Sequence, residues 1–333
     1  MSRRAFTLRV LRRLLIISVI ALLLLLGFIA FIGSRATLSP PRRSVENWHR
    51  EWLADPQAHG VELTSFTSSN GTPALLCEPG GKPQGKKAMD VRAALQDRGA
   101  ALAAWGEVRG TILLLHGHKG CKEDHLPIAE RFCAAGFRCL CVDLPGHGQH
   151  PAPYATFGHT EMALLAGVWQ DFLASRPEAT QPLFLFGVSQ GGAIALQTAA
   201  RPEWPVRAVA SVCSFTTLDQ PIDASADHLP VLIRDLKPLT TRACAMGIYC
   251  RSGFFPRQIS PLAAASRIDC PVFLCHGKED RFVPASAAER LFDAVPHERK
   301  TLRLIPHAAH HNVLATGSTE LYADICEFFL RSL

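Results

Sequence analysis

The first 43 residues lack any acidic side chain, although they carry eight arginines. Removing these eight charges from the formal net charge of +6 leaves −2 for the rest of the chain. The basic character therefore belongs to the N-terminal segment, and the remainder lacks the positive surface by which proteins hold nucleic acids. We expect no nucleic-acid partner.

The 11 cysteines contain no C-x-x-C pair, and this absence argues against a redox motif or a structural zinc site. Their odd number leaves at least one thiol unpaired in a monomer. Cys139, Cys141 and Cys275 fall in predicted core strands, where a thiol behaves as a small apolar side chain. Cys244 and Cys250 fall in a loop-rich insertion and are better candidates for a disulfide. No internal repeat is visible, which argues against a solenoid or a propeller.

Charge is also missing from the 20-residue run between Leu14 and Gly33. A helix of this length spans about 30 Å, the thickness of the hydrocarbon core of a bilayer. A signal peptide normally has a shorter apolar region of about 7–15 residues and a small-x-small cleavage site, which Ser34-Arg35-Ala36 matches poorly. We therefore predict a basic segment at 1–13, an uncleaved transmembrane anchor at 14–33 and a linker at 34–59. Cleavage is the alternative.

Positive charge is unequal on the two sides of this run. Five arginines precede it and three follow it: Arg3, Arg4, Arg9, Arg12 and Arg13, then Arg35, Arg42 and Arg43. The excess before the run predicts that the N-terminus stays in the cytoplasm. The rest of the chain is then expected in the periplasm, a lumen or the exterior.

Apolar runs of strand length alternate with helical stretches over residues 60–333. The expected strands are 111–115, 138–142, 182–186, 207–213, 271–275 and 300–305, with helices such as 126–135 and 161–175 between them. This alternation predicts one α/β domain with a mostly parallel sheet covered on both faces. Residues 61–66 and 73–77, joined by Ser68-Ser69-Asn70-Gly71, are typical of an antiparallel hairpin at the edge of the sheet.

The stretch Gly187-Val188-Ser189-Gln190-Gly191 lies between an apolar strand and a helix-like run. A G-x-S-x-G sequence in this setting forms a strained turn that lifts the serine hydroxyl above the sheet. Gly187 and Gly191 must be small because strand and helix crowd them. Alone the motif is weak, and an ordinary strand-to-helix loop is the alternative.

A serine hydroxyl becomes a nucleophile when a base takes its proton and a carboxylate orients that base. Downstream, Asp280 follows the strand 271–275, and His310 lies in a histidine-rich loop after the strand 300–305. Upstream, the strand 111–115 ends in His116-Gly117. The backbone amides of His118 and Gln190 would then form an oxyanion hole, in which each donor lowers the barrier by about 3–4 kcal/mol.

Four motifs occur together in one order. They are Leu115-His116-Gly117, the sequence D-L-P-G-H-G at 143–148, the turn at 187–191, and H-G-x-x-D-x-x-V-P within 271–284. With this ordered set, residues 60–333 resemble a serine hydrolase of the α/β-hydrolase superfamily, in its serine aminopeptidase-like and lysophospholipase-like branch. The resemblance implies an α/β-hydrolase fold, a doubly wound, mostly parallel sheet with a small cap insertion at about 219–260.

The resemblance also implies a catalytic order of serine, acid and histidine, which assigns Ser189 as nucleophile, Asp280 as acid and His310 as base. The family often has Pro-Gly-Ala-Gly-His where this chain has Pro306-His307-Ala308-Ala309-His310. His311 therefore remains an alternative base. Glu279 and Asp219 remain rival acids.

Other polar groups lie near these motifs. A metal site is a weak alternative for six histidines: His116, His118, His125, His147, His150 and His159. They fall in strand ends and loops that the hydrolase pattern already explains, and zinc needs a compact ligand set. We expect no metal and no cofactor, and a structural role for His147. The charged run 119–124 is expected to be a solvated loop or to shape the substrate pocket.

Two insertions are expected to set specificity. Residues 79–106 begin as a surface loop and continue with Val91, Leu95, Leu102 and Trp105 at roughly helical spacing, either beside the core or against a membrane. The cap insertion supplies apolar side chains that either line an acyl slot or only pack the cap on the core: Leu229, Val231, Leu232, Ile233, Phe254 and Phe255.

The sequence thus predicts a membrane-anchored serine hydrolase that cleaves a carboxylic ester or thioester through an acyl-enzyme. Its expected partners are a small-molecule or lipid acyl substrate and the membrane that holds its N-terminal helix. An aminopeptidase-like amide hydrolase is the enzymatic alternative. A catalytically silent scaffold that binds a partner is the alternative from another class.

Overall fold

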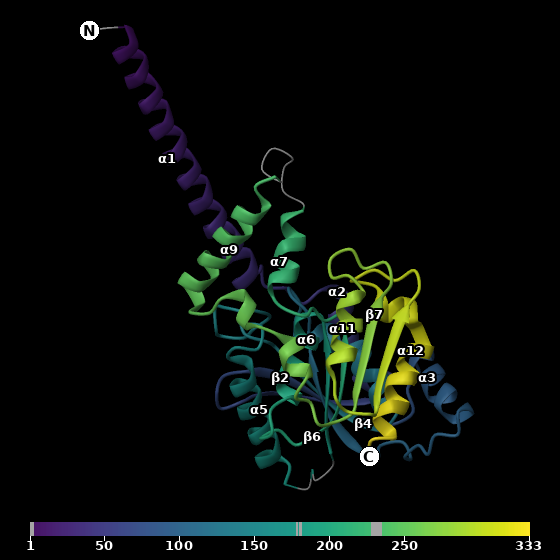
Figure 1. The fold of residues 1–333 in the computed structure, drawn as a ribbon. Coiled ribbons are helices and arrows are strands. Elements are labelled where there is room, and N and C mark those ends of the chain that lie inside the picture. The colour runs from purple at the N-terminus through teal and green to yellow at the C-terminus, as the bar shows by residue number, and fades with distance from the viewer. Residues whose placement is uncertain (1–2, 178, 180–181, 228–234) are drawn as a thin grey trace.

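One sheet of eight strands forms the centre of the described chain, which comprises residues 3–177, 179, 182–227 and 235–333 of the computed structural model (Figure 1). The strands are β1 (Val61–Thr67), β2 (Pro73–Pro79), β3 (Gly110–Leu115), β4 (Phe137–Val142), β5 (Leu183–Val188), β6 (Val206–Val212), β7 (Val272–Gly277) and β8 (Lys300–Ile305). Their order in space is β1-β2-β4-β3-β5-β6-β7-β8. The strands from β3 to β8 pair in parallel, whereas β1 and β2 form an antiparallel hairpin at one edge. The predicted sheet and its hairpin are confirmed.

Helices cover both faces of this sheet, because successive residues of a buried strand point to opposite faces. In β3, Ile112 and Leu114 pack on one side, and Leu113 and Leu115 pack on the other. The first side is covered by α3 (Lys86–Asp97), α4 (Leu126–Ala134) and α12 (Val313–Leu330). The second is covered by α5 (Glu161–Ser175), α6 (Gln190–Ala199), α10 (Pro261–Ala265) and α11 (Ser286–Ala294). The doubly wound α/β class is therefore confirmed.

The N-terminal helix α1 (Arg3–Leu38) extends well beyond the body of the molecule (Figure 1). Its stretch from Phe6 to Leu38 has a mean hydropathy of 3.2, and among the described residues it is the one helix long and apolar enough to cross a membrane. Apolar side chains from Phe6 to Leu24 are exposed to the surroundings along this projecting part. Such an uncovered apolar helix fits either a membrane anchor or a signal sequence.

The segment after α1 is folded against the domain. Leu38 is fully buried, and its carbonyl oxygen accepts a hydrogen bond of 2.7 Å from the amide of Ala155. Arg42 donates to backbone carbonyls of the loop 147–152, among them that of Gly148 at 3.1 Å. The helix α2 (Asn47–Ala54) follows, with Trp52 buried in the core.

The first insertion differs in part from its prediction. Val91 and Leu95 are fully buried on α3, which packs beside the core against α12 and α4. The helix ends at Asp97, and Gly99 then takes a left-handed φ of 75° that turns the chain. Leu102 and Trp105 therefore lie outside the helix, contrary to their spacing.

The cap lies between β6 and β7 and contains α7 (Asp219–Ala226) and α9 (Lys237–Ser252), followed by a short 3-10 turn, η3 (Pro256–Gln258). The predicted slot residues Leu229, Val231, Leu232 and Ile233 lie outside the described residues. Phe254 is buried in an apolar cluster that joins the cap to the end of α1, with the ring of His159 at 5.1 Å.

The two cysteines that the sequence offers as disulfide candidates do not form a bridge. Cys244 and Cys250 both lie on α9, and all 11 cysteines are free thiols. Six residues of helix separate them by about 9 Å along the axis, which exceeds the Cα spacing that a disulfide allows. Cys244 instead is buried against α1, and burial raises the pKa of its thiol to about 11.

Candidate active site

Ser189 sits in the tight turn between β5 and α6, with a φ of 53° and a ψ of −112°. A positive φ is strained for a residue with a Cβ, and such strain gathers at functional sites. The turn is possible because both flanking glycines lack side chains. A Cβ at Gly187 would collide with the backbone of Gly191, and one at Gly191 would collide with the carbonyl of Leu115. The sequence thus folds into the close strand-to-helix turn that its glycines predict.

Two loops at the carboxyl ends of other strands bring polar side chains to Ser189. The hydroxyl Oγ of Ser189 lies 2.9 Å from Nε2 of His310, which follows β8. The other ring nitrogen of His310, Nδ1, lies 2.6 Å from Oδ2 of Asp280, which follows β7. A carboxylate accepts hydrogen bonds, so Nδ1 carries the proton and Nε2 is left to accept the proton of the serine.

Asp280 is held in place from several sides. Its Oδ1 accepts hydrogen bonds from the amides of Phe282 at 2.9 Å and Val283 at 2.8 Å. Burial acts to raise the pKa of this carboxyl, but hydrogen bonds from His276 and His310 outweigh it and hold the pKa below its usual range. The carboxylate therefore stays ionised beside His310.

His276 is a member of this site to which the sequence gave no role. It is fully buried at the end of β7, and its Nε2 lies 2.8 Å from the carbonyl oxygen of Val283 and 3.1 Å from Oδ2 of Asp280. Both neighbours are acceptors, so Nε2 donates. Its position four residues before Asp280, at the end of an apolar strand, was the available signal.

The alternatives for base and acid lie elsewhere. His311 lines the same cavity but is exposed, whereas the hydroxyl of Ser189 faces His310. Glu279 is exposed and pairs with His307 at 3.0 Å. Asp219 begins α7 in the cap, where burial and the neighbouring Asp223 raise its pKa. His307 stands at a position where the family pattern has glycine. Its φ of 59° lies in the left-handed region that favours glycine.

The loop after β3 runs beside Ser189. A Cβ built on Gly117 would lie 3.4 Å from the carbonyl oxygen of Val188 and 3.7 Å from Cβ of Ser189. The next residue, His118, places Nδ1 3.3 Å from the side-chain oxygen of Gln190, the first residue of α6. Helix N-termini favour negative charge, so this corner suits a developing oxyanion.

Of the two alternatives for the charged run 119–124, the solvated loop is wrong for Lys122 and Glu123, which are both buried. Nζ of Lys122 lies 2.9 Å from Glu123 and 3.0 Å from Asp143. Asp143 also accepts the amides of Lys122 and Gln149. Breaking one partner of such a buried pair is costly, so this cluster fixes the loop next to Ser189. Lys119, by contrast, is exposed and lines the cavity.

Most of the six histidines for which a metal site is the weak alternative have identifiable partners or neighbours. His116 accepts the amide of Leu144 at 3.0 Å, and burial holds its pKa well below the usual value. Burial likewise lowers the pKa of His125 to about 3 and that of His147 to about 4. His150 lies 3.2 Å from the hydroxyl of Thr72. These imidazoles are neutral at ordinary pH, as buried structural groups are.

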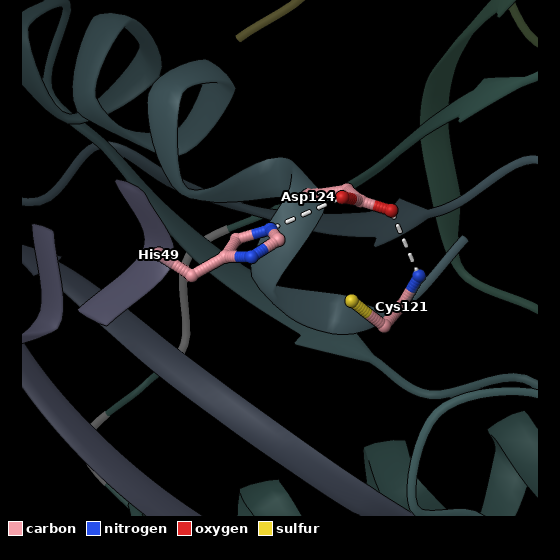
Figure 2. A group of neighbouring side chains, drawn as sticks. All are labelled: His49, Cys121 and Asp124. Atoms are coloured by element: carbon pink, nitrogen blue, oxygen red, sulfur yellow. Dashed lines mark hydrogen bonds and ion pairs between the residues drawn. The ribbon is translucent and has the colours of Figure 1, made fainter. Parts of the chain in front are cut away.

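One further cluster has metal-type side chains, namely His49, Cys121 and Asp124 (Figure 2). Figure 2 shows the imidazole and the backbone amide of Cys121 both directed at the carboxylate of Asp124, at 3.1 Å and 3.0 Å. Nδ1 of His49 accepts the amide of Glu46 at 2.9 Å. Hydrogen bonds therefore use both ring nitrogens and tie α2 to the loop after β3, which is a structural role.

A cavity of about 770 Å³ opens onto Ser189 and His310. Its size falls in the range of sites for small ligands. The walls are mainly apolar and include Phe157, Phe215, Leu218 and Ile222. Among the described residues that line it, neither Phe254 nor Phe255 occurs, so these two do not form the predicted slot. Phe255 instead stacks on Tyr249 at 4.4 Å.

Comparison with known proteins finds relatives that are similar in sequence. The chain is 24% identical over 249 residues to a monoacylglycerol lipase of Mycolicibacterium smegmatis, covering 65% of this chain and 86% of the lipase. It is 25% identical over 191 residues to the uncharacterised Bacillus subtilis protein YqkD, covering 55% of this chain and 59% of YqkD.

Among solved structures, the Pyrococcus furiosus esterase Pf2001 superposes with a TM-score of 0.63 at 17% identity, covering 88% of this chain and 98% of the esterase. This likeness concerns the fold. The family model described as serine aminopeptidase, S33, matches residues 106–246 and 253–314, which is more than half of the chain. The chain therefore belongs to the S33 serine aminopeptidase family of the α/β-hydrolase superfamily.

Proposed function

We propose that this protein is a membrane-anchored serine hydrolase that cleaves carboxylic esters, with lipid-derived esters as its natural class. The observation that carries the proposal is the continuous hydrogen-bonded series from Ser189 through His310 to Asp280, at 2.9 Å and 2.6 Å. Family membership supports hydrolase chemistry in general.

The proposed reaction has two halves. Ser189 attacks the acyl carbonyl while Nε2 of His310 takes its proton and passes it to the leaving alcohol. The amides of His118 and Gln190 donate to the oxyanion as it forms. Water then attacks the acyl-enzyme while His310 takes one of its protons. His310 returns this proton to Oγ of Ser189 as the bond to the acyl carbon breaks, and the acyl group leaves as a carboxylic acid. Asp280 keeps the imidazole in the required tautomer, and His276 keeps Asp280 in place.

Fluorophosphonate labelling of the full chain in detergent tests the nucleophile. Wild-type protein should label, and the Ser189→Ala variant should not, while both show the same thermal unfolding. Absence of labelling in folded wild-type protein would favour the alternative of a silent binding scaffold. Labelling that persists in Ser189→Ala would show that another residue is the nucleophile.

Ester and amide substrates distinguish the two enzymatic candidates. The similarity to a monoacylglycerol lipase supports the ester, whereas the family description supports an aminopeptidase-like amide hydrolase. A panel of 4-nitrophenyl esters, thioesters and amino-acid 4-nitroanilides at equal concentration separates them. We expect turnover of the esters; faster turnover of the anilides would replace our assignment with the amide.

We also propose that α1 is retained as an anchor and that the domain is extracytoplasmic. The support is the apolar run of α1 with its arginine excess at the N-terminal side. Protease treatment of intact and opened cells gives the topology. We expect the protease to digest the domain when it reaches only the outer surface or the periplasm of the cells. Protection of the domain under these conditions would mean that the domain lies in the cytoplasm.

A further inference from the structure

The carboxyl-terminal turns of α1 are packed into the catalytic domain. Helix α1 lies along α9 of the cap (Figure 1), and the backbones meet at small residues. A Cβ on Gly247 would collide with the carbonyl of Ala30, and a Cβ on Gly33 would lie 2.7 Å from Sγ of Cys244. Close backbone contact of this kind holds α1 in one position relative to the cap.

The same turns line the cavity above Ser189. Ile29, Gly33, Ala36 and Thr37 form part of its wall, together with cap residues and with Ser189 and His310. The ring of His118 joins the two regions, because its Nε2 lies 3.3 Å from the carbonyl oxygen of Ala36 and its Nδ1 faces Gln190. Burial lowers the pKa of His118 to about 3, so this contact involves a neutral imidazole.

Neighbouring residues of α1 point in the opposite direction. Phe28 is 63% exposed, whereas Ile29 next to it lines the cavity. Phe31 is 50% exposed, and the guanidinium of Arg251 on α9 lies over its ring at 4.8 Å. Ile29 and Gly33 both belong to the apolar run expected in the bilayer. One face of this part of the helix is thus exposed, while the other lines the cavity that holds Ser189.

We propose that α1 is a specificity-determining wall of the acyl site and that the substrate is a long-chain acyl ester resident in the same membrane. This inference rests on the proposed esterase function. The part of the lining that α1 supplies through Ile29, Gly33 and Ala36 is apolar, and it favours an apolar chain because burying a charged group there without partners costs several kcal/mol. The ester lies at Ser189, and its chain lies against Ile29 and Gly33. Cleavage at Ser34-Arg35-Ala36 would remove this wall, so retention of α1 is part of the proposal.

Substitutions on the two faces of α1 test the wall in full-length protein in lipid nanodiscs. Ile29→Trp adds bulk inside the cavity, whereas Phe28→Trp adds a similar ring on the lipid side. We expect Ile29→Trp to lower kcat/KM for 4-nitrophenyl palmitate at least about tenfold more than kcat/KM for 4-nitrophenyl butanoate. Phe28→Trp should change neither substrate. Equal loss for both esters, or no loss for palmitate, in folded Ile29→Trp would overturn the proposal.

A crosslinking experiment separates this inference from the esterase assignment. A monoacylglycerol ether analogue cannot be hydrolysed, and a diazirine near the end of its chain records the position of that chain. We expect crosslinks within residues 29–37 of wild-type protein and of Ser189→Ala. Crosslinks confined to other segments overturn the wall even if esters are hydrolysed. Crosslinks at 29–37 without hydrolysis support the wall and refute the esterase.

Discussion

Single side chains decide how firmly the candidate acid is held. Oδ2 of Asp280 faces two imidazoles, those of His310 and His276, and only the first of these contacts Ser189. His276 is therefore a positioning residue. It fixes the carboxylate, and it also binds the carbonyl of Val283 in the loop that carries Asp280.

His276→Leu removes the donor to Asp280 and leaves a buried carboxylate with one partner fewer. We expect kcat for a short ester to fall by about tenfold to a hundredfold, with little change in KM, because substrate contacts remain. His276→Gln keeps a donor near the position of Nε2 and should recover much of the loss. Steady-state kinetics with fluorophosphonate labelling of each variant provide the measurement. Equal activity of the His276→Leu variant and the wild-type protein would contradict a positioning role.

At the scale of elements, the contact of α1 with α9 depends on glycine. Gly247→Ala places a Cβ against the carbonyl of Ala30, so the two helices must separate. We expect a destabilisation of about 1–3 kcal/mol, typical of overpacking. Gly27 on α1 has no atom within 4 Å of a built Cβ, and Gly27→Ala should be neutral or stabilising by up to about 1 kcal/mol. Thermal unfolding in detergent compares them. A Tm of Gly247→Ala equal to that of wild type would show that the helices do not meet there.

Local sequence patterns predicted the sheet well, because its strands are short apolar runs bounded by turns, and the edge hairpin has its own turn signal. Helix α3 shows the limit of such patterns. The helical spacing of apolar residues continues past Gly99, but the helical backbone ends before it. The packing of α1 against the cap and the burial of Lys122 by Asp143 depend on residues far apart in sequence. No local pattern reports such contacts.

In the candidate site, too, local patterns predicted some features and not others. Ser189, Asp280 and His310 stand at strand ends, and parallel strands bring their carboxyl ends to one edge, so their meeting was predictable. The choice of His310 over His311 depended on the resemblance to a family. Cys244 and Cys250 were weak disulfide candidates because they share one helix, which the composition of the insertion does not indicate.

For the whole molecule, buried neutral histidines set the response to acid. The folded pKa of His118 and of His125 is about 3, and that of His147 is about 4, below the unfolded value of about 6.5. The unfolded chain therefore binds more protons, so stability is highest above about pH 6.5 and is lost as the pH falls toward 4.

Each such imidazole lowers the free energy of unfolding by up to about 1.4 kcal/mol for each unit by which the pH falls between about 6.5 and 4. His125→Gln removes one of these imidazoles and leaves the hydrogen bonds among Ser189, His310 and Asp280 in place. We expect the free energy of unfolding of this variant to fall less steeply between about pH 6.5 and 4 than that of wild type. Denaturant titrations across this range provide the measurement. Parallel pH dependences for the two proteins would mean that His125 is not kept neutral by folding.

Arg42 lies only four residues beyond α1 and donates hydrogen bonds to carbonyls of the loop 147–152. No long flexible linker therefore separates α1 from the domain. A domain on a long tether sweeps a volume and meets its substrates at their concentration in water. With α1 held in a membrane as we propose, Ser189 would stay at one height above the bilayer, and it would meet its substrate by diffusion within the membrane. The turnover rate should then follow the mole fraction of substrate among the lipids, and diluting the vesicles in buffer should leave it unchanged.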